Sequence, residues 1–332
     1  MSDAANVLEV KDLNVTYRTS SGPVPAVRGV SFSLAAGETL GIAGESGCGK
    51  STMAMSLLRL LPPGATATGT VLLGGEDVLT MKPGQLRAVR WSQASIVFQG
   101  AQHVLNPVQR IGRQIGEAIR VHQPSTSTST VEARVRDLLS LVGLTGRRSD
   151  DYPHELSGGQ KQRVMIAMAL ACDPQLVIAD EPTTALDVMV QAQVLSLLAD
   201  IKRERGLSLL FITHDLSVLS TIADRLAVMY AGRIVEEGPA RDLLRGSTHP
   251  YTQALAAAFP TIGDASSRFM PRGLDGDPPD PADVPSGCAF HPRCPVALDI
   301  CATTTVELRP VAGDHQRRAA CVHVDAVTGA VS

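Results

Sequence analysis

The sequence predicts an α/β domain followed by a small cysteine-rich extension. Apolar runs of strand length, at 40–43, 176–179 and 207–213, alternate with segments whose apolar residues recur at helical spacing. A helix is expected over 50–61, ended by two prolines, and a β-hairpin over 226–237. This alternation is typical of a sheet with connecting helices.

Length and composition limit the classes of function that this chain can have. The 332 residues suffice for one large domain and a smaller one, and a net charge of −3 provides no basic field for nucleic acid. The longest apolar run, 164–172, is about half of a membrane span, and the N-terminal residues lack a signal-peptide pattern. We therefore expect a soluble protein that acts at a membrane only through partners.

The segment 44–51 matches the phosphate-binding P-loop pattern, between a strand and a helix. Its glycines let backbone N–H groups converge on phosphate oxygens, and the helix N-terminus favours negative charge. Lys50 is expected to reach the β- and γ-phosphates, and the Ser51 hydroxyl to ligate Mg²⁺. The predicted nucleotide-binding residues here are Gly44, Glu45, Ser46, Gly47, Cys48, Gly49, Lys50, Ser51 and Thr52.

Two acids end the apolar strand at 176–179. Asp180 fits the second Mg²⁺ anchor of P-loop enzymes. Glu181 comes one residue later, where a carboxylate can orient and deprotonate the attacking water. The sequence therefore predicts a nucleotide hydrolase rather than a nucleotide-binding protein alone.

A third motif gives the family. Ser157, Gly158, Gly159 and Gln160 open a helix, and this segment resembles the signature of ATP-binding-cassette (ABC) ATPases. Across that family the signature binds the γ-phosphate of a nucleotide held by a second subunit. The resemblance implies the family's P-loop fold, a mixed sheet with an inserted helical subdomain. It also assigns further site residues: Tyr17 stacking on adenine, Gln99 of the Q-loop near Mg²⁺ and the water, Asp187 of the D-loop, and the switch histidine His214.

A narrower resemblance lies outside the catalytic motifs. Segments 152–170, 180–193, 249–255 and 288–295 are similar to the dipeptide/oligopeptide (peptide/nickel-type) importer branch. That resemblance implies a peripheral subunit at the cytoplasmic face of the inner membrane. Its partners would be a second, non-identical ABC ATPase, two transmembrane permeases and an extracytoplasmic solute-binding protein. The segment 100–107 departs from many peptide importers, which keeps oligosaccharides or nickel open as solutes.

Four of the six cysteines lie near the C-terminus: Cys288, Cys294, Cys301 and Cys321. Without a secretory signal such a cluster favours metal ligation over disulfides. The importer branch implies a 4Fe–4S cluster, for which four thiolates are the required number. Structural zinc stays an alternative, although zinc cysteines are usually paired two to four residues apart and no such pair occurs here.

These observations predict an ATPase domain over 1–245 with a helical subdomain at about 100–170. The extension over 246–332 would contain a Pro/Gly/Asp-rich linker at 260–285 and the four-cysteine motif at 288–321. Two other function classes compete with the importer ATPase. One is a soluble cassette protein of DNA repair or translation, and the other a metal- or redox-sensing module with a vestigial ATPase.

Overall fold

The computed structural model describes residues 5–100, 104–184, 186–258, 274 and 276–326. Its strands are β1 (Asn6–Thr19), β2 (Gly22–Ala35), β3 (Thr39–Ala43), β4 (Ala65–Leu73), β5 (Glu76–Asp77), β6 (Ala94–Val97), β7 (Leu176–Asp180), β8 (Ser208–Thr213), β9 (Arg225–Tyr230), β10 (Arg233–Pro239), β11 (Arg309–Val311) and β12 (Asp314–Ala319). Its α-helices are α1 (Lys50–Leu57), α2 (Pro83–Val89), α4 (Ile111–His122), α5 (Thr128–Leu141), α6 (Gly158–Ala169), α7 (Val188–Arg205), α8 (Leu216–Ile222), α9 (Ala240–Gly246) and α10 (Pro250–Ala257). Short 3-10 helices cover Gly146–Asp150, Pro153–Glu155, His291–Arg293, Asp299–Ala302 and Val322–Ala326.

The chain forms two compact units. The first unit comprises Met1–Leu8, Leu34–Glu38 and Leu72–Ile212, and the second unit comprises Glu9–Ser33, Thr39–Val71 and Thr213–Ser332. Much of the linker expected at 260–285 lies outside the described residues. Its described part, from residue 276 onward, contains neither helix nor strand.

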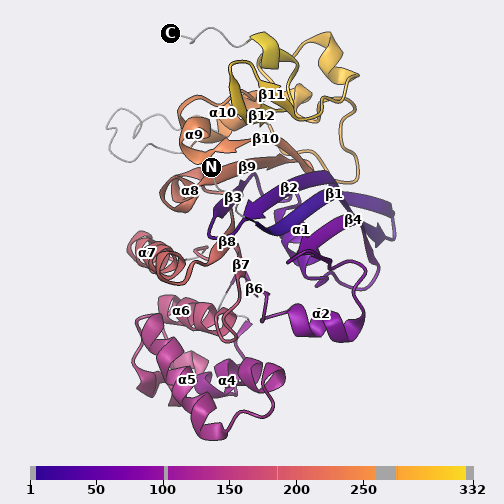
Figure 1. The fold of residues 1–332 in the computed structure, drawn as a ribbon. Coiled ribbons are helices and arrows are strands. Elements are labelled where there is room, and N and C mark those ends of the chain that lie inside the picture. The colour runs from indigo at the N-terminus through magenta and orange to yellow at the C-terminus, as the bar shows by residue number, and fades with distance from the viewer. Residues whose placement is uncertain (1–4, 101–103, 185, 259–273, 275, 327–332) are drawn as a thin grey trace. The chain divides into compact units, whose positions relative to one another are not determined.

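The first unit contains parallel strands in the order β8-β7-β6. Every residue of β7 is buried, as expected for a parallel strand covered on both faces. Helices α4, α5 and α6 pack against one another (Figure 1). The packing faces consist of apolar residues that recur at helical spacing. On α4 these include the buried Ile111, Ile115 and Ile119.

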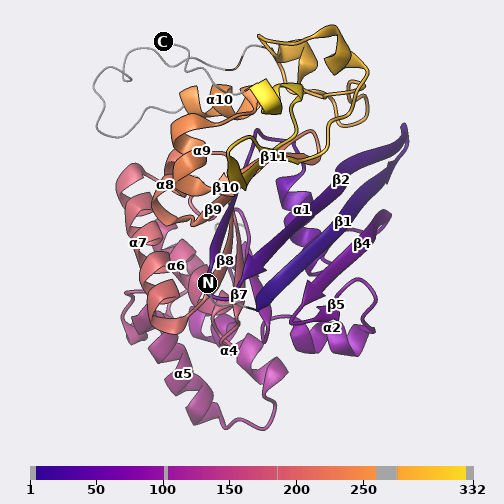
Figure 2. The same ribbon diagram turned by 45° about the horizontal axis from the view of Figure 1, so that its top comes forward.

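The second unit contains strands in the order β11-β12-β10-β9-β3. Strand β3 pairs with β9 in parallel, whereas β9, β10, β12 and β11 pair antiparallel, so this sheet is mixed. Glu236 of β10 lies opposite Ala319 of β12. This pairing joins the C-terminal extension to the sheet of the second unit, where Figure 1 and Figure 2 show the extension beside β10. Strands β2, β1 and β4 lie side by side in that order. The predicted α/β fold with a mixed sheet is confirmed.

Two local predictions can be compared with the structure. The hairpin expected over 226–237 is formed by β9 and β10, with Ala231 and Gly232 in left-handed conformations at the turn. The prediction of a helix over 50–61 was wrong at its C-terminal end, because α1 ends at Leu57. Arg59 then adopts a left-handed φ of 51°, so the backbone leaves the helix before the prolines are reached.

Candidate active site

The P-loop lies in the second unit between β3 and α1. Gly44 and Gly49 have φ values of 156° and 103°, which side-chain-bearing residues rarely adopt. A Cβ on Gly44 would clash with the carbonyl of Met229, and one on Gly49 with the carbonyl of Ala26. The glycines therefore permit both the conformation of the loop and its close approach to neighbouring backbone.

Lys50 is buried at the start of α1, with 4% of its surface exposed. Its ammonium group donates hydrogen bonds to the carbonyl oxygens of Gly44 (2.7 Å) and Glu45 (2.9 Å). A cation is thus held under the loop, where phosphate oxygens are expected to bind. The Tyr17 hydroxyl lies 3.0 Å from that of Thr52 on the first turn of α1, so Tyr17 lies next to the P-loop helix. Its stacking on adenine stays a prediction.

Glu181 and Gln99 meet in the first unit, at the carboxyl ends of β7 and β6. The Glu181 carboxylate accepts hydrogen bonds from Gln99 Nε2 (2.9 Å) and Thr184 Oγ1 (2.8 Å). Its backbone has a φ of 46°, and its N–H donates to the carbonyl of Ile212 at 2.9 Å. Asp180, the residue before it, is 4% exposed. A non-glycine residue in this conformation at a strand end is typical of a functional position.

The signature segment begins α6 with a reciprocal cap. Ser157 Oγ accepts a hydrogen bond from the Gln160 N–H, and Gln160 Oε1 accepts one from the Ser157 N–H. Asp187 caps α7 through a single hydrogen bond, which its side chain accepts from the Val190 N–H at 3.0 Å. A Cβ on Gly159 would clash with Val190, so the starts of α6 and α7 are in close contact. The structure therefore brings the signature and the D-loop aspartate together; Ala185 of that loop lies outside the described residues.

His214 follows β8 directly, is exposed, and lies in the second unit with the P-loop and Tyr17. Asp215, the next residue, caps α8 by accepting from the Ser217 N–H at 2.8 Å. The predicted residues of the first unit are Gln99, Ser157, Gly158, Gly159, Gln160, Asp180, Glu181 and Asp187.

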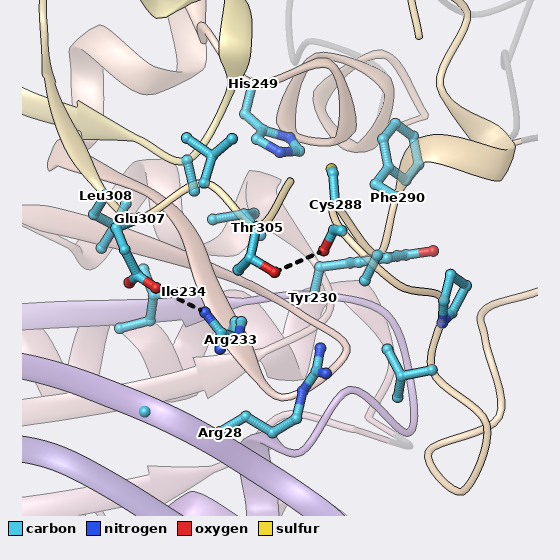
Figure 3. A pocket seen from close by; sticks show the side chains of 18 of the residues that line it. Arg28, Tyr230, Arg233, Ile234, His249, Cys288, Phe290, Thr305, Glu307 and Leu308 are labelled. Atoms are coloured by element: carbon cyan, nitrogen blue, oxygen red, sulfur yellow. Dashed lines mark hydrogen bonds and ion pairs between the residues drawn. The ribbon is translucent and has the colours of Figure 1, made fainter. Parts of the chain in front are cut away.

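The four C-terminal cysteines line one small cavity, together with His249, Phe290 and His291 among others. The Cys301 sulfur accepts a hydrogen bond from the Leu298 N–H at 3.5 Å. No group of three or more His, Cys, Asp or Glu side chains in the described part of the chain is arranged to hold a single metal ion. Cys288 also faces a cavity of about 400 Å³, where Figure 3 shows its thiol near His249.

His249 is fully buried, and burial lowers its pKa to about 4, so the ring is neutral at pH 7. Its Nδ1 accepts from the Tyr251 N–H at 3.1 Å and caps α10. The Glu236 carboxylate accepts from the N–H groups of Thr248 and His249. The segment 249–255 is therefore built into the second unit.

Two residues at this site were missed by sequence reasoning. Arg293 forms a two-bonded ion pair with Glu45 of the P-loop, and the Tyr251 hydroxyl accepts the Glu45 N–H. Both lie in segments that resemble the importer branch, but nothing in their spacing indicates a contact with the P-loop.

Family models match two parts of the chain. The model described as "ABC transporter" matches residues 27–184, and that of the "Oligopeptide/dipeptide transporter, C-terminal region" matches 235–301. The dipeptide transport ATP-binding protein DppD of Bacillus subtilis is 44% identical over 299 residues, which cover 89% of this chain and 88% of DppD. The chain belongs to the ABC transporter ATP-binding family. Both resemblances found in the sequence are thereby confirmed.

Further relatives and structures agree with this family. The oligopeptide transport ATP-binding protein OppD of Escherichia coli is 46% identical, over 90% of this chain and 88% of OppD. The OppD protein of Mycobacterium tuberculosis is 47% identical over 97% of this chain, but the chain spans only 53% of its length. Among solved structures, the dimeric post-hydrolysis state of the ATP-binding cassette MJ0796 with ADP and Pi aligns with a TM-score of 0.64 and 28% identity. That alignment covers 70% of this chain and 99% of the cassette.

Proposed function

We propose that this ABC subunit hydrolyses MgATP. The observation that carries the proposal is the carboxylate of Glu181, held by Gln99 and Thr184 at the end of a buried strand. A carboxylate fixed in this way is suited to orient and deprotonate a water molecule. The buried ammonium group of Lys50 supplies the positive charge that the β- and γ-phosphates require.

The remaining roles follow from the chemistry of each side chain. The Ser51 hydroxyl and the Asp180 carboxylate are oxygen donors that suit Mg²⁺, which when bound would neutralise charge on the phosphates. His214, exposed at the end of β8, is proposed to hold the γ-phosphate. Ser157 and Gln160 are proposed to act on the nucleotide of a partner subunit, because the capped start of α6 offers backbone N–H groups.

We further propose that hydrolysis drives uptake of di- or oligopeptides. The names of the DppD and OppD relatives and the match of residues 235–301 support a peptide over an oligosaccharide or nickel. No helix in the described residues is long and apolar enough to cross a bilayer. The proposed assembly includes two transmembrane permeases, a second, non-identical ABC ATPase and an extracytoplasmic binding protein, with this chain at the cytoplasmic face.

The experiment that tests this assembly is purification of the tagged full chain from membranes, with mass spectrometry of its partners. Proteoliposomes of the purified complex would then be assayed for ATP-dependent uptake of labelled peptides, oligosaccharides and nickel. We expect peptide uptake that stops when ATP is replaced by ADP. Uptake of an oligosaccharide or nickel but not of peptides would contradict the proposed solute while leaving the ATPase role intact.

The four C-terminal cysteines are proposed to ligate a 4Fe–4S cluster. Their position around one cavity and the hydrogen bond from the Leu298 N–H to the Cys301 sulfur support this, because such hydrogen bonds stabilise thiolate ligands of iron–sulfur clusters. When bound, a cluster would crosslink 288–301 to Cys321 near β12. Structural zinc at the same four cysteines is the alternative.

A further inference from the structure

The C-terminal extension contacts the P-loop through an ion pair between Arg293 and Glu45. Arg293 Nη1 lies 2.7 Å from Glu45 Oε2, and Arg293 Nη2 lies 3.0 Å from Glu45 Oε1. Two parallel bonds from a guanidinium to a carboxylate fix both side chains more firmly than a single contact does. The Arg293 side chain is 8% exposed and that of Glu45 is 20% exposed, so water screens this pair only weakly.

An aromatic cluster holds Arg293 in place. Its guanidinium lies 5.9 Å from the ring centres of both Tyr230 and Phe290, and it donates to the Tyr230 hydroxyl at 3.3 Å. Tyr251 packs on both rings, with centroid distances of 4.5 and 5.4 Å. Figure 3 shows Tyr230 and Phe290 lining the cavity that Cys288 also faces.

The backbone of Glu45 is held as well. Its N–H donates to the Tyr251 hydroxyl at 2.8 Å, and its carbonyl accepts from Lys50 at 2.9 Å. Three side chains therefore fix three different groups of one P-loop residue. Two of these side chains, those of Arg293 and Tyr251, come from the segments that follow the ATPase motifs.

A carboxylate in a phosphate-binding loop poses an electrostatic problem. Glu45 follows Gly44 directly, so its negative charge lies within the loop that is to receive a triphosphate. Like charges repel, and the repulsion is about fourfold stronger at the effective dielectric constant near a protein surface than in bulk water. Arg293 both neutralises this charge and holds the carboxylate in one orientation.

We propose that Arg293 is a positioning residue for nucleotide binding, which neutralises Glu45 and holds its carboxylate so that the P-loop presents net positive charge to the phosphates. The inference rests on the proposed ATPase function and adds to it a residue outside the ATPase motifs. The proposal does not depend on metal binding by the four C-terminal cysteines.

The test is a double-mutant cycle on the full chain, with the dissociation constant for MgATP measured at equilibrium. We expect Arg293→Gln to raise this constant roughly tenfold at low ionic strength, because an unpaired Glu45 then repels the phosphates. The Arg293→Gln/Glu45→Gln double variant should return to within about threefold of the wild-type constant, because the repelling charge has gone. Rising salt should shrink the effect of Arg293→Gln, and ADP should show a smaller effect than ATP.

A matched control is Arg318→Gln. Arg318 forms a similar ion pair with Glu237 at 2.7 Å, between β12 and β10, so its loss should leave ATP affinity unchanged. The melting temperature and iron content of every variant are also measured. They distinguish a misfolded variant from one in which only the affinity for MgATP has changed. If Arg293→Gln does not fold, Arg293→Lys serves instead, because it retains the charge but not the paired bonds. It should weaken MgATP binding by about threefold, and the added Glu45→Gln change should remove that loss. Wild-type affinity in Arg293→Lys would then contradict the inference.

Three results would overturn the inference. Wild-type affinity in Arg293→Gln would show that the ion pair does not act on nucleotide binding. A double variant as weak as the single one, or an effect insensitive to salt, would give Arg293 a purely structural role. A wild-type chain that fails to bind MgATP would instead refute the proposed ATPase function.

Discussion

The carboxylate of Glu181 accepts a hydrogen bond of 2.9 Å from the side-chain amide of Gln99. Together with the hydrogen bond from Thr184 Oγ1 at 2.8 Å, this contact fixes the direction of the carboxylate. Glu181→Gln preserves the size of the side chain and removes the base. We expect MgATP still to bind, while turnover in the assembled transporter falls by roughly 10²–10⁴.

The matched control for that variant is Glu132→Gln, on the exposed face of α5. It removes one carboxylate from the same unit and should leave turnover unchanged. Near-normal ATPase activity in Glu181→Gln would show that another residue activates the water.

The contact between Gly159 and Val190 gives a second prediction. A Cβ at position 159 would clash with the stiff, β-branched Val190 at the start of α7. We expect Gly159→Ala to lower the free energy of unfolding by about 1–3 kcal/mol, and Val190→Ala to restore part of it. Gly84→Ala is the control, because Gly84 is also helical but has open space around it. Equal stability of the two glycine variants, measured by denaturant unfolding, would contradict the close packing.

Local motifs account for what was predictable from the sequence. The P-loop and the acids after β7 are contiguous, so their residue types and the adjoining apolar strands indicate both the element and the chemistry. The Gln99–Glu181 contact was not predicted, although both residues follow neighbouring parallel strands, whose carboxyl ends lie at the same edge of a sheet.

Long-range contacts were not predictable in this way. Arg293 and Glu45 are 248 residues apart, and no periodicity connects positions at that separation. The glycine at 159 was interpreted only as an anion-binding position, because a sequence does not show that Val190 would occupy the space beside it. The N-terminus of α5 is a smaller case: Ser127 caps this helix, but Ser125 and Ser129 have the same capping propensity.

The signature gives a third prediction. If Ser157 acts on the nucleotide of a partner subunit, Ser157→Arg should abolish hydrolysis at the partner's site without weakening ATP binding to this chain's own P-loop. An arginine at the exposed cap of α6 would fill the position where a phosphate is expected. Binding to the isolated chain and turnover of the assembled complex are the two measurements. Full-rate turnover by the monomeric wild-type chain would refute a shared site.

Tyr251→Phe tests the second contact to Glu45. The variant keeps the aromatic packing with Tyr230 and Phe290 but leaves the Glu45 N–H without its acceptor. An unsatisfied N–H costs about 1–3 kcal/mol, so we expect a lower melting temperature and weaker MgATP binding. Tyr152→Phe, whose ring stacks on His154 in the first unit, should change neither quantity. An unchanged melting temperature in Tyr251→Phe would show that another group takes over the Glu45 N–H.

The last prediction concerns the four cysteines. Burial raises the pKa of the Cys288, Cys294 and Cys321 thiols, so several thiolates share this cavity favourably only with a cation between them. We expect protein purified without oxygen to be brown and to contain about four irons per chain. Cys301→Ser should lose this colour and iron. Cys172→Ser is the control and should retain both, because Cys172 lies in the first unit next to Ala118 of α4. Removal of the metal should also lower the melting temperature, because the extension between 276 and 326 has few regular elements of its own. One zinc and no iron per colourless chain would refute the cluster and assign a structural zinc site to the same cysteines.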